Sequence, residues 1–185
     1  MEQGYRTIIW GLFIATFHIN LFEIPIFPAF IGWLIIISGM NKLLTENDSK
    51  SFLKARIYAL IIFIISLIIQ MLPLMRIQNE AAQLLTIIYS IFYLLFVYYL
   101  LEGSIQYLRG LGEISYAEHY YAIQRAYIII YVLDIILACV AFTIADQVLL
   151  IFTAVLGIIL VISFMVNIKT IKNIEITSTE EPKIT

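Results

Sequence analysis

The segment VLLIFTAVLGIILVISFMVNI, residues 148–168, carries no charged side chain. At about 1.5 Å of rise per residue, a helix of this length covers roughly 30 Å, which is the thickness of the hydrocarbon core of a bilayer. Similar apolar stretches recur along the chain, which is 62% hydrophobic and 13% charged, with a mean hydropathy of +0.98. Soluble domains are about 25% charged. The sequence therefore predicts an integral membrane protein whose main partner is the lipid bilayer.

Short polar stretches, prolines and glycines divide the chain into six apolar segments. The expected spans are residues 7–22, 28–44, 55–74, 82–101, 122–145 and 148–168. Only Asp146 and Gln147 separate the last two, so we expect a tight hairpin there. The sequence predicts an all-α fold, a polytopic membrane helix bundle of six transmembrane helices. It forms a single domain over residues 1–168, and a flexible cytoplasmic tail follows at 169–185.

Two longer polar loops are expected between these spans. The first covers residues 45–54, and the second and longest covers residues 102–121. Gly103, Gly110 and Gly112 are expected to break helical structure in the second loop, because glycine is a poor helix former.

The positive charges predict the orientation, because Lys and Arg beside short loops are retained on the cytoplasmic side of a membrane. The chain has eleven Lys and Arg residues, and the six-span arrangement leaves Arg76 alone on the outer side. The other ten are Arg6, Lys42, Lys50, Lys54, Arg56, Arg109, Arg125, Lys169, Lys172 and Lys183. We therefore predict that both termini lie in the cytoplasm.

Several classes of function are excluded by composition. The net charge of −2 offers no basic stripe for nucleic acid. His18 and His119 are expected at different depths, which argues against bis-histidine haem. No serine elbow or H-E-x-x-H motif is present. Glu118 beside His119 is too little for a metal site, and Cys139 is the single cysteine. We predict no enzyme activity, metal or cofactor, and lipid-modifying chemistry is the alternative that these motifs leave open.

Asp134 is the one carboxylate expected near the centre of a span. An unpaired charge there costs at least ~2.5 kcal/mol on insertion scales, so the group needs a partner or a proton. Helical spacing places Tyr127, Tyr131, Asp134, Ala138 and Ala141 on one face, where the alanines permit close helix packing. Asp134 and Tyr131 are therefore candidates for ligand binding, and a hydrogen-bonded packing role is the alternative.

The first span carries a second group of candidates. Gly11 and Ala15 form a small-xxx-small pair on the face that also carries His18. This span is short, so the turn that follows can lie at membrane depth, where irregular backbone is tolerated only if it is buried or lines a cavity. Asn20 and Glu23 lie in or beside this turn.

We hypothesise that His18, Asn20 and Glu23 face an outward cavity whose deeper wall includes Asp134 and Tyr131. The alternatives are a single hydrogen-bonded histidine and an exposed loop acid. In the fourth span, Thr86, Tyr89, Ser90 and Tyr93 share a polar side; interhelical hydrogen bonds are the favoured interpretation there, and a solute path is the alternative.

The stretch Ile24-Pro-Ile-Phe-Pro-Ala-Phe-Ile-Gly-Trp33 resembles uncharacterised small multi-span membrane proteins of Gram-positive bacteria. The resemblance covers mainly the first two spans and implies a multi-pass protein of a bacterial cytoplasmic membrane, with no catalytic residues to carry over. The layout of six spans in a short chain is also similar to the substrate-binding subunits of energy-coupling-factor transporters, which often carry small-xxx-small alanines on the first span.

Two hypotheses about function follow. In the first, the bundle binds or transports a small-molecule solute through an outward-facing polar cavity. In the second, it is a non-catalytic accessory, immunity or regulatory subunit, whose partner is a larger membrane protein complex or a second copy of the chain. Asp134 would bind the solute in the first hypothesis and stabilise the bundle in the second.

Overall fold

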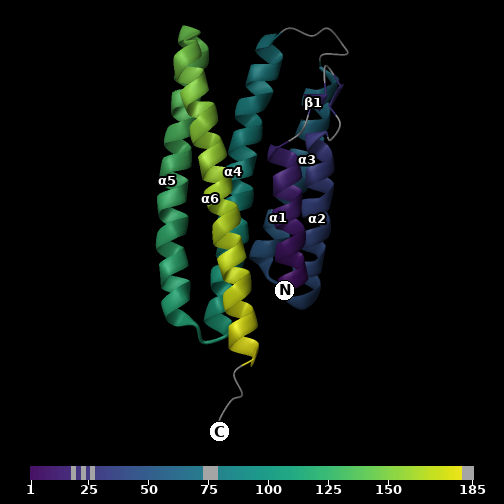
Figure 1. Cartoon of the computed structure of the whole chain (residues 1–185), viewed down its shortest axis with the longest axis vertical. Coiled ribbons are helices and arrows are strands. Elements are labelled where there is room, and N and C mark those ends of the chain that lie inside the picture. Colours follow the sequence, from purple (N-terminus) through teal and green to yellow (C-terminus); the bar gives the residue numbers. More distant parts are fainter. Residues whose placement is uncertain (18–19, 22–23, 26–27, 73–78, 181–185) are drawn as a thin grey trace.

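The computed structural model describes residues 1–17, 20–21, 24–25, 28–72 and 79–180, and it is built almost entirely of helices (Figure 1). The helices are α1 (Glu2–Thr16), α2 (Ala29–Glu46), α3 (Lys50–Met71), α4 (Asn79–Gly110), α5 (Ile114–Ile144) and α6 (Gln147–Glu180). Between α1 and α2, the two-residue strands β1 (Asn20–Leu21) and β2 (Ile24–Pro25) pair antiparallel. The predicted all-α bundle of six helices is confirmed.

Five of these helices are long and apolar enough to cross a membrane. Their candidate spans are Ala29–Glu46, Lys50–Met71, Ala82–Gly110, Ile114–Ile144 and Gln147–Ile171. The remaining helix, α1, has 15 residues and therefore rises only about 22 Å. It lies earlier in the chain than the expected span 7–22, because Gly4 and Tyr5 are buried in contact with the rest of the bundle and belong to the helix.

The six helices form a closed ring. Each helix packs against the next in the chain, and α6 returns to pack against α1. Aromatic side chains of α4 fill the centre: the fully buried Phe96 lies 5.4 Å from Trp33 of α2 and 6.5 Å from Phe164 of α6, between ring centroids. A 2.8 Å hydrogen bond between the hydroxyls of Tyr5 and Ser104 joins α1 to α4. The buried core of the bundle therefore lies along α4.

Glycine residues form the contact between α1 and α2. A Cβ on Gly32 would lie 2.5 Å from the amide nitrogen of Ala15 and 2.6 Å from the carbonyl oxygen of Gly11. A Cβ on Gly39 would likewise lie 2.9 Å from the carbonyl oxygen of Gly4. The two backbones therefore touch directly, as small residues permit between membrane helices.

The two long loops expected from the sequence are largely helical, which corrects the prediction. Residues 102–110 continue α4, and α5 begins at Ile114. Gly103 does not break the helix but leaves room for Phe52 of α3, whose ring carbon lies 2.6 Å from the position of a Gly103 Cβ. Gly112 does mark the turn, with a φ of 86°. The loop expected at 45–54 is similarly reduced to a turn between α2 and α3, with Ser49 accepting a hydrogen bond from the Ser51 amide.

The tight hairpin between α5 and α6 is confirmed. Ala145 adopts a left-handed conformation, and Asp146 Oδ1 accepts hydrogen bonds from the amides of Val148 and Leu149. At its other end α6 continues to Glu180, so residues 169–180 are helical where the sequence indicated a flexible tail. The buried Ile171 extends the packed face of α6 past residue 168.

The first turn of α1 and the last turn of α6 both lie toward the lower end of the bundle in Figure 1. An even number of antiparallel helices requires this arrangement, and it is compatible with both termini on one side of a membrane. The cytoplasmic location of that side stays a prediction from the positive charges.

Candidate functional site

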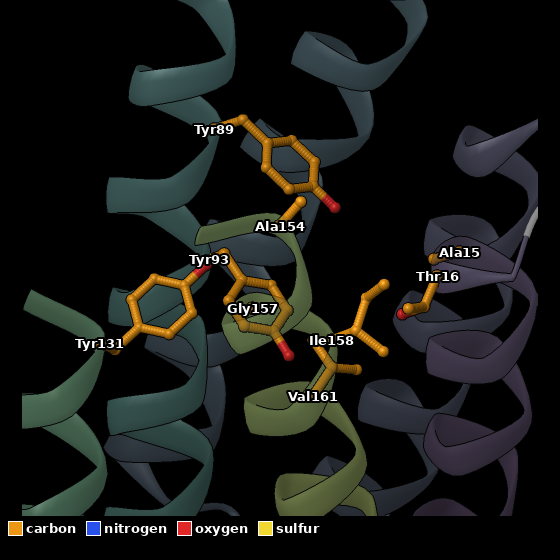
Figure 2. A pocket seen from close by; sticks show the side chains of 9 residues that line it. All are labelled: Ala15, Thr16, Tyr89, Tyr93, Tyr131, Ala154, Gly157, Ile158 and Val161. Carbon is orange, nitrogen blue, oxygen red and sulfur yellow. The ribbon is translucent and has the colours of Figure 1, made fainter. Parts of the chain in front are cut away.

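A pocket of about 220 Å³ lies among four of the helices (Figure 2). It is lined by Ala15 and Thr16 of α1, Tyr89 and Tyr93 of α4, Tyr131 of α5, and Ala154, Gly157, Ile158 and Val161 of α6. These helices come from both ends of the sequence, so the pocket depends on closure of the ring between α1 and α6.

The short first helix and two small residues on α6 create the space. Because α1 ends at Thr16, its last turn forms one wall of the pocket. On the facing helix, Ala154 and Gly157 are three positions apart in the sequence, so they lie on the same side of α6. Large side chains at these two positions would occupy the volume between α1, α4 and α5.

Three tyrosine rings form the aromatic wall, and Figure 2 shows them on the side opposite Ala15 and Thr16. The rings of Tyr89 and Tyr93 are nearly parallel, with centroids 6.5 Å apart, and the ring of Tyr131 lies 5.5 Å from that of Tyr93. The Tyr89 hydroxyl accepts a 3.1 Å hydrogen bond from Trp33 Nε1, which fixes the position of its ring.

The hydroxyls of Tyr93 and Tyr127 interact with each other, although neither makes a hydrogen bond of good geometry among the described residues and Tyr93 is only 4% exposed. A buried hydroxyl without a partner costs about 1–3 kcal/mol. Since Tyr93 lines the pocket, a polar group of a bound molecule could replace this weak interaction.

Asp134 lies directly behind the pocket wall at Gly157. Its Oδ2 atom is 3.7 Å from the position that a Gly157 Cβ would occupy. The residue is 9% exposed, and Oδ1 has no hydrogen-bond partner among the residues described. Because Gly157 has no side chain, nothing from that residue separates the carboxylate from the pocket.

The structure brings together part of the predicted site. Tyr131 lines the pocket, Asp134 borders it, and Ala15 contributes from α1. His18 and Glu23 lie outside the described residues. The backbone of Asn20 is described in β1, but its side chain is not.

The residues proposed for helix packing have different positions. Gly11 and Ala15 lie in the contact with α2, and Ala141 is fully buried. Ala138 is only partly buried.

Sequence reasoning missed the contribution of α6 and the terminal Thr16 of α1. It noticed Tyr89 and Tyr93 but favoured interhelical hydrogen bonds for them, and Tyr89 does make one with Trp33. One signal was available: Gly157 is the single glycine of α6, and Ala154 lies one turn before it. This pair indicates either a close helix contact or a cavity, and only the neighbouring helices decide between the two.

Comparison of the chain with protein-family models, with curated proteins and with solved structures finds no match. The interpretation of the pocket therefore depends on its own geometry.

Proposed function

We propose that this integral membrane protein binds a small solute in the tyrosine-lined pocket, as a carrier or as the membrane-embedded binding subunit of one. The observation that carries the proposal is the pocket itself, whose wall combines apolar side chains with the hydroxyls of Thr16 and three tyrosines and has the carboxylate of Asp134 beside Gly157. A mostly apolar cavity with a few convergent polar groups is the usual form of a small-molecule site.

The size of the pocket limits the solute. Its volume of about 220 Å³ lies below the roughly 300–1,000 Å³ typical of pockets for drug-sized ligands. A compact solute therefore suits it best.

The position of the pocket favours access from the outer side. It lies at the end of α1 away from the N-terminus, and the positive charges predict a cytoplasmic N-terminus. A solute entering between the last turn of α1 and the first half of α6 would reach the three tyrosines.

Native mass spectrometry of the protein purified in mild detergent tests the proposal. The variant Gly157→Leu adds a large side chain to the wall of the pocket. Its Cβ would make only an ordinary 3.7 Å contact with Asp134 Oδ2, so the first carbon of the new side chain does not clash. The matched control is Gly110→Leu, at a position with no atom within 4 Å of an added Cβ. We expect a small-molecule adduct on the wild type and on Gly110→Leu that is absent from Gly157→Leu.

Retention of the adduct by folded Gly157→Leu would place the solute elsewhere. A stoichiometric protein partner on all three forms, without a small-molecule adduct, would instead favour the accessory-subunit hypothesis.

A further inference from the structure

We propose that the solute is a small organic cation, with an alkylated ammonium group held between the tyrosine rings and Asp134. This inference rests on the proposed function and adds to it the charge and chemical class of the solute.

The charges around the pocket favour a cation. Among the described residues that line it, none is Lys, Arg or His, and the carboxylate of Asp134 lies beside Gly157 in its wall. Oδ1 of this carboxylate has no partner among the described residues. A bound cation would supply the opposite charge that an intramembrane carboxylate requires.

The aromatic wall favours an ammonium carrying carbon substituents. A cation within about 6 Å of a tyrosine ring centroid is attracted by the electron-rich face of the ring, and desolvation strengthens this attraction. Tyr89, Tyr93 and Tyr131 all line the pocket, with the ring of Tyr93 at 10° to that of Tyr89 and at 30° to that of Tyr131, so a bound cation would lie against this stack rather than inside a cage of rings. Ile158 and Val161 add an apolar surface that suits alkyl groups rather than a hydrated metal ion.

Gly157 lines the pocket and lies beside the carboxylate, since a Cβ at this position would be 3.7 Å from Asp134 Oδ2. A larger side chain here would crowd the space next to Asp134. Gly157→Leu and Asp134→Asn should therefore impair cation binding by different means, the first by steric exclusion and the second by removal of charge.

Three probes of nearly equal shape test the inference. Choline is the cation, and tert-butylethanol (3,3-dimethylbutan-1-ol) is its neutral carbon isostere. The third probe, tert-butylacetate, is the 3,3-dimethylbutanoate anion, which is similar in size. Trp33 supplies the signal, because its indole donates a hydrogen bond to Tyr89 in the pocket wall. The chain has two tryptophans, and the exposed Trp10 is first replaced by Phe so that Trp33 alone reports binding.

We expect saturable binding of choline to the Trp10→Phe protein, about tenfold tighter or more than binding of tert-butylethanol, and no binding of tert-butylacetate. Asp134→Asn should weaken choline binding by about tenfold or more and leave tert-butylethanol binding unchanged. Gly157→Leu should abolish binding of both, and Gly110→Leu should abolish neither. Size-exclusion chromatography and circular dichroism establish that each variant is folded.

Equal binding of choline and tert-butylethanol, or preferential binding of tert-butylacetate, would overturn the cation assignment and leave the solute-binding pocket standing. Unchanged choline affinity in Asp134→Asn would also overturn it. If none of the probes alters Trp33 emission, the cation assignment fails, and the small-molecule adduct lost from Gly157→Leu then decides separately whether the pocket binds a solute.

Discussion

At the scale of single residues, Asp134 of α5 and Gly157 of α6 lie side by side. The carboxylate is nine-tenths buried, and the absent side chain of Gly157 leaves it beside the pocket. The proposed site needs both residues. Gly157 without Asp134 would only permit close packing of helices, and a leucine at position 157 would crowd the space next to the carboxylate.

Replacement of Asp134 by Asn should stabilise the ligand-free protein by about 1–3 kcal/mol, because it removes an acid that must otherwise hold either an unpaired charge or a proton, with no partner for Oδ1 among the described residues. Thermal unfolding in mild detergent, in the absence of any cation probe, measures the change. A matched Asp146→Asn variant, at the exposed cap of α6, should not raise the stability.

A loss of stability in Asp134→Asn would mean that the carboxylate has a partner in the segments not described, for which His18 is the candidate from the sequence. A double-mutant cycle that combines Asp134→Asn with His18→Gln then gives the coupling free energy between the two residues. Coupled residues should show non-additive effects, whereas independent residues add within about 0.5 kcal/mol.

The sequence identified Asp134 and Tyr131 because an acid in an apolar run is conspicuous by itself. Gly157 and Ala154 were not identified, since a small residue in a membrane helix has no chemistry of its own. Its meaning depends on which helix lies opposite, and that information is tertiary. His18 and Glu23, conspicuous for the same reason as Asp134, stay predictions.

At the scale of helices, the direct backbone contact of α1 with α2 holds the short first helix in place. Because α1 provides only 15 residues, it depends on packing more than the longer helices do. The close approach at Gly32 and Gly11 is therefore a sensitive point of the bundle.

Gly32→Ala should destabilise the protein by about 1–3 kcal/mol, because the new methyl group would lie 2.5 Å from the backbone nitrogen of Ala15, which cannot move aside as a flexible side chain can. Denaturant titration in detergent measures the loss. Gly110→Ala is the control, since its methyl group meets no atom within 4 Å, and an equal loss in both variants would contradict a specific contact.

Hydropathy was sufficient to predict the helices but not their ends. It located each apolar stretch, whereas the helices α4 and α6 continue into charged sequence that was interpreted as a loop and a tail. In both cases a buried face continues: Ser104, Ile105 and Leu108 in α4, and Ile171 in α6. The bilayer fixes where a span must be apolar, but packing against neighbours decides where the helix stops.

At the scale of the whole molecule, the predicted orientation can be tested at two turns that lie at opposite ends of α5. Cys139 is the single native cysteine, so Cys139→Ala provides a background for labelling. Ser115→Cys and Gln147→Cys each place an exposed thiol next to one turn.

A membrane-impermeant maleimide applied to intact cells should label Gln147→Cys and should label Ser115→Cys only after the membrane is permeabilised, because the positive charges assign the α4–α5 turn to the cytoplasm. Labelling in the reverse order would invert the orientation and would direct the pocket toward the cytoplasm.

The closed ring of helices also bears on synthesis. The pocket is flanked by α1 and α6, the first and last helices of the chain to leave the ribosome. The glycine contact between α1 and α2 can form before the other four helices are made. The pocket is complete only when α6 arrives, and a molecule seated between α1 and α6 would connect the earliest-made helix to the last.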